Sequence, residues 1–181
     1  MTSTPNPFFY IPRPGLPEPA LTARDVQRIA TLHPRLQPLA RRLILEGGAA
    51  LHHYPEPSKL RAVRYGITQA YRSYAEQAAL YGQGRTESQL TSIGVPGHLA
   101  KPNLPRVSNA RPGMSLHERM LNGKPAAQAF DVAPFDAAGQ PVWDTRAPEW
   151  QLIGAVGKSL GLTWGGDFTS IKDMPHFELP L

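Results

Sequence analysis

Apolar residues with helical spacing run from about residue 21 to residue 51 near the start of the chain. Proline disfavours helical conformation in the residue that precedes it, so we expect an interruption at His33 and Pro34. Gly47 and Gly48 are expected to weaken or end this helix, because glycine is a poor helix former. The pattern therefore predicts a helical segment in two parts.

A second helical pattern lies toward the carboxyl end of the chain. Pro148 suits the first turn of a helix, and Gly161 suits its end. Between them, apolar residues recur at helical spacing and form one stripe. The residues of this stripe are Leu152, Ile153, Val156 and Leu160.

Three segments have the pattern of β-strands: residues 63–70, 129–134 and 176–179. In a strand, alternate side chains point to opposite faces, so Asp131 lies opposite Phe130, and His176 shares a face with Glu178. The strands are separated by one or two helices without regular β-α-β alternation. We therefore predict an α+β fold with a small antiparallel sheet and flanking helices.

Short sequence patterns in the middle of the chain predict a helix, a loop and a hairpin. Ser73 followed by Glu76 is a capping-box pattern that opens a short helix, which we expect to end near Tyr81. Residues 85–114 are rich in Gly, Pro, Ser and Asn and are predicted to form a long loop. The Asn-Gly-Lys stretch at residues 122–124 has the composition of a hairpin tip.

Composition narrows the possible chemistry. A chain of 181 residues with 41% hydrophobic and 18% charged residues suits one globular domain. The net charge of +5 suits polyanionic partners, namely nucleic acid, an acidic membrane or an acidic cell wall. Because the basic residues are spread along the chain, a solvated basic surface is the more common explanation. The chain has no cysteine, so any metal must bind through histidine and carboxylate side chains.

The sequence contains no pattern typical of export or membrane insertion. Residues 1–19 lack a cationic segment followed by an apolar one, and no apolar stretch approaches the ~18 residues that span a bilayer. We therefore expect synthesis in the cytosol, and release by another protein if the chain acts outside it.

The last third of the chain holds a candidate metal set. His117, Asp131 and His176 provide two imidazoles and a carboxylate, which suffice for a catalytic Zn²⁺ that keeps a fourth position open. Asp173 precedes His176 by three residues and is a candidate general base. Each of these residues alone is more commonly a solvated or satisfied polar group, and only the joint pattern points to a metal site.

Further residues are candidates for substrate contacts. Arg72 follows a predicted strand and is a candidate to stabilise a developing oxyanion, the alternative being an exposed cation at a helix start. Ser115 either contacts substrate or caps a turn. Glu178 either orients a metal ligand or lies on a strand surface. Trp164 either lines a cleft or belongs to the core.

Several motifs together resemble the L-alanyl-D-glutamate peptidases of phage endolysins, within the wider group of zinc D-Ala-D-Ala carboxypeptidases and the Hedgehog-type fold. The order Ser-x-His, Ala-x-Asp and Asp-x-x-His-Phe-Glu is specific, and the resemblance covers roughly residues 61–181. The motifs that carry it are Ile67–Ser73, Gln77–Tyr81, Gly84–Thr86, Val107–Gly113, Ser115–His117, Ala129–Asp131, Trp164–Asp167 and Asp173–Glu178.

The resemblance implies a role for each matching residue. It implies zinc binding by His117, Asp131 and His176, and a general base at Asp173. It also implies an oxyanion or substrate contact at Arg72, a substrate contact at Ser115 and a cleft-lining position for Trp164.

Two extra stretches, residues 87–106 and 118–128, depart from compact members of the group. Residues 1–60 do not match it. We interpret them as a Pro-rich lead-in and an added helical segment, beside a zinc peptidase core at 61–181, all within one compact domain.

The predicted function is hydrolysis of the peptide stem of bacterial peptidoglycan, at the L-Ala–D-Glu bond by resemblance, in host cell lysis after holin-type release. One alternative is a D-Ala-D-Ala carboxypeptidase of the same fold. The other is a non-catalytic, zinc-stabilised domain that binds the wall or nucleic acid. We expect a monomer with peptidoglycan peptide as substrate, and no nucleic-acid partner.

Overall fold

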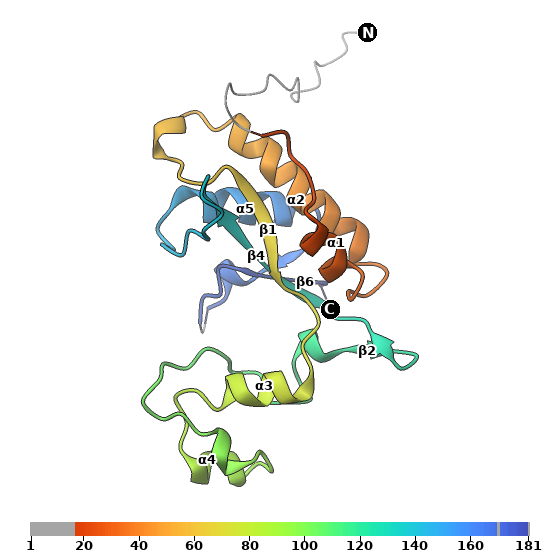
Figure 1. Cartoon of the computed structure of the whole chain (residues 1–181), viewed down its shortest axis with the longest axis vertical. Coiled ribbons are helices and arrows are strands. Elements are labelled where there is room, and N and C mark those ends of the chain that lie inside the picture. Colours follow the sequence, from red (N-terminus) through yellow and green to blue (C-terminus); the bar gives the residue numbers. More distant parts are fainter. Residues whose placement is uncertain (1–16, 170, 181) are drawn as a thin grey trace.

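The computed structural model describes residues 17–169 and 171–180, so most of the predicted Pro-rich lead-in lies outside the described residues. The described strands form a four-stranded antiparallel sheet in the order β1-β4-β6-β5 (Figure 1). A two-stranded hairpin, β2 and β3, projects from it. The strands are β1 (Arg64–Gln69), β2 (Met120–Leu121), β3 (Lys124–Pro125), β4 (Ala129–Phe135), β5 (Thr163–Trp164) and β6 (His176–Glu178).

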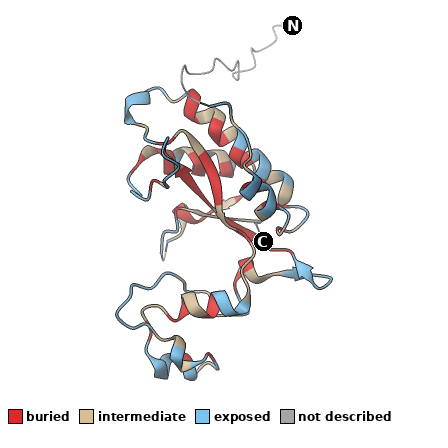
Figure 2. Ribbon diagram, viewed as in Figure 1, coloured by how far each residue is buried: buried red, intermediate tan, exposed pale blue. Residues whose placement is uncertain are grey.

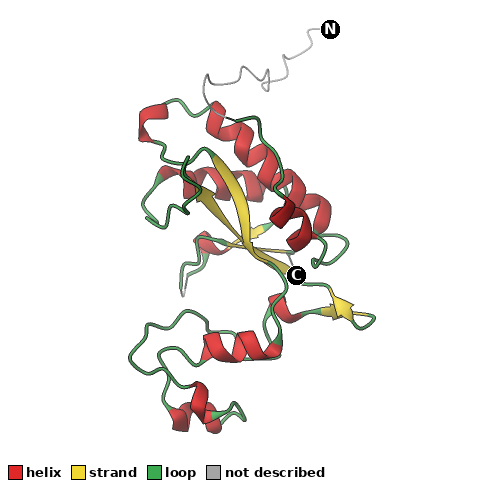
Figure 3. Ribbon diagram, in the orientation of Figure 1, coloured by secondary structure: helices red, strands yellow, loops and turns green. Residues whose placement is uncertain are grey.

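Helices flank this sheet, and the α+β architecture predicted from the sequence is confirmed (Figure 3). Helix α2 packs against both α5 and β1, and α1 also contacts β1. Apolar side chains of these helices and of the sheet form one core. The buried residues in Figure 2 accordingly gather on the strands and on α2 and α5. The helices are α1 (Ala23–Ile29), α2 (Gln37–His52), α3 (Tyr74–Tyr81), α4 (Glu87–Thr91) and α5 (Pro148–Ser159), with short 3-10 turns at Pro57–Lys59, Gly97–Leu99, Leu116–Glu118 and Gly165–Asp167.

The interruption predicted at His33 and Pro34 is present, because α1 ends before it and α2 begins after it. Gly47 and Gly48 do not end the helix, as one form of the prediction had it, since α2 continues through both. A Cβ atom on Gly47 would overlap the side chain of Ile153 in α5, and one on Gly48 would crowd Pro19. Close packing against neighbouring segments therefore requires glycine here and outweighs its poor helix propensity.

The region predicted as one long loop, residues 85–114, contains the short helix α4 and a 3-10 turn. Thr86 caps α4 reciprocally with Gln89, and Leu90 of the helix is buried. Leu90 packs with residues of α3 in a small apolar cluster separate from the main core. Helices α3 and α4 thus form a second unit, which lies below the sheet in Figure 1.

The remaining local predictions agree with the structure. Ser73 and Glu76 form the capping box at the start of α3. Asn122 and Gly123 form the tip of the β2–β3 hairpin with φ angles of 51° and 75°, so the segment between His117 and Asp131 loops out of the way. Among the described residues, no helix is long and apolar enough to cross a membrane.

Candidate metal centre and active site

A cavity of about 680 Å³ is lined by residues of the sheet, of α3 and of the 106–117 region. Its lining comes from segments far apart in the sequence, including the end of β1, the 106–117 region, β4 and the residues before β6. The predicted residues His117, Asp131, His176, Asp173 and Arg72 all line it. Ser115 and Glu178 line it as well, so the fold gathers seven of the eight residues singled out for chemistry into one cavity.

Strand pairing brings two of the candidate ligands together. In the β4–β6 ladder, Asp131 is directly opposite His176, so their side chains share a face of the sheet. In β1, a bulge at Thr68 shifts the register beside Asp131. The Thr68 hydroxyl donates a hydrogen bond of 3.2 Å to the carbonyl oxygen of Asp131, which fixes this part of β4 at the cavity.

His117 approaches from the 3-10 turn at Leu116–Glu118. The backbone N–H of Arg72 donates to the carbonyl oxygen of His117 at 3.0 Å and joins this turn to the end of β1. The imidazole Nδ1 of His117 lies 2.8 Å from the carbonyl oxygen of Ala70, which can only accept, so Nδ1 carries the proton. The Nε2 atom of His117 is therefore left with its lone pair facing the other candidate ligands.

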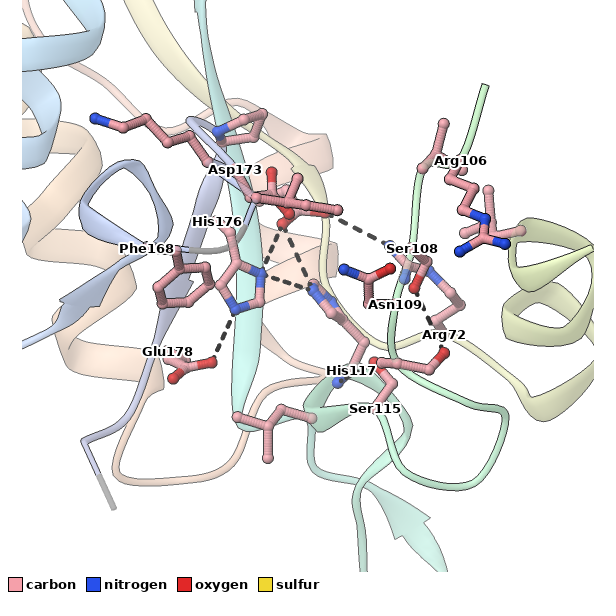
Figure 4. Close-up of a pocket in the computed structure, with 18 of the residues that line it drawn as sticks. Arg72, Arg106, Ser108, Asn109, Ser115, His117, Phe168, Asp173, His176 and Glu178 are labelled. Atoms are coloured by element: carbon pink, nitrogen blue, oxygen red, sulfur yellow. Dashed lines mark hydrogen bonds and ion pairs between the residues drawn. The ribbon is translucent and has the colours of Figure 1, made fainter. Parts of the chain in front are cut away.

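Three candidate ligand atoms form a nearly equilateral triangle (Figure 4). His117 Nε2 lies 3.4 Å from His176 Nδ1 and 3.5 Å from Asp131 Oδ1. His176 Nδ1 lies 3.4 Å from the same oxygen. Ligand atoms at tetrahedral positions around Zn²⁺, each ~2.0–2.1 Å from the ion, are about 3.3–3.4 Å apart, so the set fits this metal.

The electrostatics of the triangle also fit a cation. The oxygen Asp131 Oδ1 is buried and accepts no hydrogen bond within the described part of the chain. Burial alone would raise the pKa of Asp131, but the nearby imidazoles of His117 and His176 outweigh it and hold this pKa well below its usual range. Burial would lower the pKa of His176, yet Asp131 and Glu178 raise it to about 9. The carboxylates thus favour positive charge at this point.

Glu178 orients His176 from the outer side. Its carboxylate oxygen lies 2.9 Å from His176 Nε2, so this nitrogen donates and Nδ1 faces the triangle. Carboxylates that accept a proton from the outer nitrogen of a metal-binding histidine fix the ring orientation and raise its basicity. Of the two interpretations of Glu178, the geometry supports the orienting one.

Asp173 lies in the tight turn before β6, and its side chain lines the cavity. Its backbone N–H donates to Gly165, and its carbonyl oxygen accepts from the N–H of His176 at 3.1 Å. Burial is the main cause that raises the pKa of Asp173, and the nearby carboxylate of Asp131 adds to it. A carboxylate with a raised pKa is a better proton acceptor, which suits the predicted role as general base.

Arg72 reaches the triangle from the end of β1. Its Nη2 atom lies 3.5 Å from Asp131 Oδ2, and its Nη1 atom donates a 2.7 Å hydrogen bond to the side-chain oxygen of Gln77. The guanidinium is mostly buried and lines the cavity, so it is not an exposed cation at a helix start. It provides a fixed positive charge beside the candidate metal position.

Ser115 and Trp164 occupy different positions relative to the cavity. Ser115 lines it, and its hydroxyl oxygen accepts from the backbone N–H of His117 at 3.3 Å, so this side chain also caps a turn. Trp164 is 2% exposed, belongs to the main core and does not line the cavity, contrary to the cleft-lining prediction. Its indole N–H donates to the carbonyl oxygen of Met174 and so supports the turn that carries Asp173.

Sequence reasoning missed several residues at or beside the cavity. Gln77 does not line the cavity, but it is fully buried and accepts a hydrogen bond from Arg72, which does line it. Arg106, Ser108 and Asn109 line the cavity from the region interpreted as a loop. Phe168 lies against His176, with a distance of 5.8 Å between ring centroids. No local pattern marks these side chains, because their neighbours are distant in the sequence.

Residues 126–179 match a family model described as D-alanyl-D-alanine carboxypeptidase. Over 120 residues, the chain is 33% identical to peptidoglycan L-alanyl-D-glutamate endopeptidase CwlK of Bacillus subtilis (strain 168), covering 62% of this chain and 59% of that protein. The chain thus spans about three fifths of the length of this curated relative.

Among solved structures, the crystal structure of Serratia marcescens L-Ala D-Glu endopeptidase ChiX aligns with 97% of this chain and 94% of its own. The identity is 18% and the TM-score is 0.44. The family model covers Asp131, Asp173 and His176 but begins after His117 and Arg72. The matches in sequence confirm the predicted resemblance: this chain is similar to the L-alanyl-D-glutamate peptidases and to the wider group of D-alanyl-D-alanine carboxypeptidases.

Proposed function

We propose that this chain is a zinc metallopeptidase that hydrolyses the peptide stem of bacterial peptidoglycan, at the bond between L-Ala and D-Glu. The observation that carries the proposal is the triangle of His117, Asp131 and His176, which borders a cavity that Asp173 and Arg72 also line. A purely structural zinc site is closed by four protein ligands and needs neither a base nor an arginine. This arrangement therefore favours catalysis over a stabilising role.

When bound, Zn²⁺ would lower the pKa of a coordinated water and polarise the scissile carbonyl group. His117 would bind through Nε2, since Ala70 accepts the proton of its Nδ1. His176 would bind through Nδ1, since Glu178 holds its Nε2. Asp131 would contribute Oδ1, the oxygen that has no hydrogen bond of its own within the described residues.

Asp173 would act as the general base. Its carboxylate, with a raised pKa, would accept a proton from the attacking water and return it to the nitrogen of the leaving amine. Arg72 would stabilise the negative charge that develops on the carbonyl oxygen, because its guanidinium is already fixed by Gln77. Ser115 lines the same cavity, and its hydroxyl would donate a hydrogen bond to the substrate peptide.

The relatives support the choice of substrate. The name of the Bacillus subtilis protein specifies a peptidoglycan L-alanyl-D-glutamate endopeptidase, and that match includes 62% of this chain. A net charge of +5 suits approach to an acidic wall or membrane surface. We propose a monomer that acts in host lysis as a phage endolysin. It would be made in the host cytoplasm and reach the wall through a membrane pore formed by a separate holin-type protein.

The test is a digest of purified sacculi by the zinc-loaded protein, followed by mass spectrometry of the muropeptides. A new free amine on D-Glu supports the endopeptidase. The loss of a single Ala instead supports the D-Ala-D-Ala carboxypeptidase. This second candidate function is favoured by the family model that matches residues 126–179, which is described as D-alanyl-D-alanine carboxypeptidase. Binding to sacculi without any cleavage, with or without a chelator, would replace both by a zinc-stabilised wall-binding domain.

A further inference from the structure

Gln77 of α3 is 0% exposed, and both the oxygen and the nitrogen of its side-chain amide form hydrogen bonds. Its oxygen accepts the 2.7 Å hydrogen bond from Arg72. Its nitrogen donates to the hydroxyl of Ser108 at 2.9 Å and to the carbonyl oxygen of Ala110 at 2.7 Å. One buried amide therefore connects the guanidinium at the candidate metal centre with a segment more than thirty residues away in the sequence.

That segment, residues 106–110, contributes five consecutive residues to the lining of the cavity. Arg85, itself buried, donates a further hydrogen bond of 3.0 Å to the segment, at the carbonyl oxygen of Ser108, and its guanidinium stacks over the ring of Tyr81. Figure 4 shows Arg106, Ser108 and Asn109 on the same side of the cavity as Arg72, across from His176. We call residues 106–110 the cleft wall.

The cleft wall has no regular secondary structure, and a segment of this kind is usually mobile. A buried amide or guanidinium left without hydrogen-bond partners is destabilising, so the buried side chains of Gln77 and Arg85 favour the ordered wall. Val107 is 52% exposed, and Asn109 is also exposed. The backbone N–H groups of these two residues donate to no acceptor within the described part of the chain. An extended peptide can pair with such groups.

We propose that Gln77 is a positioning residue that couples Arg72 to the cleft wall, so that the wall binds the backbone of the stem peptide while Arg72 faces its scissile carbonyl group. This inference rests on the proposed function for the identity of the peptide. The coupling itself is a property of the protein without substrate, and it is measurable separately.

The experiment compares the zinc-loaded wild type with Gln77→Met, Gln77→Glu and Gln83→Met. Gln77→Met removes both the amide oxygen that accepts from Arg72 and the amide nitrogen that donates to the cleft wall. Gln77→Glu keeps an acceptor for Arg72 but cannot donate to the cleft wall. Gln83→Met is the matched control, because Gln83 lies just beyond α3 and does not line the cavity. Zinc content and the unfolding midpoint of each variant are measured first to establish that the fold is retained.

The first readout is limited digestion with trypsin, which needs no activity of the protein. Arg106 precedes Val107 and is a cleavable position within the wall, whereas Arg111 precedes proline and resists. We expect both Gln77 variants to speed cleavage after Arg106 by about tenfold, because local opening becomes easier when the buried contacts are lost. Gln83→Met is expected to match the wild type.

The second readout is turnover of a soluble stem peptide. For Gln77→Met we expect kcat to fall by about tenfold to a hundredfold and KM to rise, since small displacements of a catalytic group have effects of this size. For Gln77→Glu we expect the rise in KM with a kcat nearer the wild type. In an Arg72→Met background, Gln77→Met is expected to lower kcat no further.

A folded, zinc-bound Gln77→Met protein with the tryptic rate and kcat of Gln83→Met would overturn the proposal. If Gln77→Met does not fold, Gln77→Glu decides between the same outcomes. If even the wild type releases no D-Glu amine, the proposed function fails, and the tryptic rates alone decide whether Gln77 orders the wall.

Discussion

The carboxyl group of Asp173 lies in a cavity with the candidate zinc ligands, but its atoms belong to none of the close contacts of the triangle. Replacement by asparagine keeps the size of the side chain and removes its capacity to accept a proton. We expect Asp173→Asn to bind zinc as the wild type does and to lose about 10²- to 10⁴-fold in kcat, the range typical of general-base loss.

Zinc content by elemental analysis and turnover on muropeptides check this prediction. Asp167→Asn is the matched control, because Asp167 is exposed and pairs with Lys158 outside the cavity. Loss of zinc together with activity in Asp173→Asn would instead make Asp173 a ligand.

Glu178 holds the imidazole of His176 in place by accepting a hydrogen bond from its Nε2 atom. Without its carboxylate, Nε2 of His176 loses its acceptor, and the ring is free to turn or to change tautomer. We expect Glu178→Ala to weaken zinc binding by about 10- to 100-fold, and Glu178→Gln to weaken it less, since an amide oxygen still accepts the proton. Competition with a chromogenic chelator measures both affinities. Equal affinity in all three proteins would contradict an orienting role.

At the scale of elements, the packing of α2 against α5 depends on Gly47. A methyl group at this position would overlap Ile153, and a fully packed core yields only by shifting side chains or backbone. We expect Gly47→Ala to destabilise the protein by about 1–3 kcal/mol, although alanine is the better helix former. Arg41→Ala, on the exposed face of the same helix, is expected to stay within about 0.5 kcal/mol of the wild type.

Urea unfolding followed by circular dichroism measures both changes. A stabilised Gly47→Ala protein would mean that α2 and α5 separate easily, and it would remove the packing argument for glycine at this position.

Two features of the helices and strands differ from the predictions made from the sequence, namely helix α4 and the position of Trp164. Helix α4 was not predicted because glycine and proline dominate its surroundings, although Thr86 and Gln89 form the same kind of capping box that was recognised at Ser73. Trp164 was expected in the cleft because a motif pattern does not tell which face of a short strand is buried. Its partner across the sheet is Phe177, which faces the core.

For the whole molecule, a metal held by His117, Asp131 and His176 would join β4, β6 and the turn that carries His117. Binding to the folded state alone stabilises a protein in proportion to the logarithm of ligand concentration, by about 2.7 kcal/mol at one hundred times the dissociation constant. We therefore expect a chelator to lower the unfolding midpoint of the zinc-loaded protein. His176→Ala removes a ligand, so we expect it to lose bound zinc, wall lysis and the effect of the chelator.

Differential scanning calorimetry with and without chelator checks this prediction. His98→Ala is the control, because His98 lies in the 3-10 turn at Gly97–Leu99 and does not line the cavity. Wall cleavage by His176→Ala without bound zinc would contradict the proposed chemistry as a whole.

The division of residues 1–60 from residues 61–181 stays a prediction. Side chains of α1 and α2 share the main core with the sheet, so any independent folding of the later segment has to be measured on the separated piece.

The sequence by itself determined the local features. A helix cap, a hairpin tip and the alternation of a strand each depend on neighbouring residues. The sequence therefore predicted the cap at Ser73, the hairpin tip at Asn122 and the shared face of His176 and Glu178. The order of the motifs also pointed to the three residues of the candidate metal triangle. Only the tertiary structure decided how His117 and Asp131, 14 positions apart, meet at 3.5 Å, and that Gln77 connects Arg72 with the cleft wall. Such contacts arise from strand register and packing between distant segments, and local sequence patterns carry no information about either.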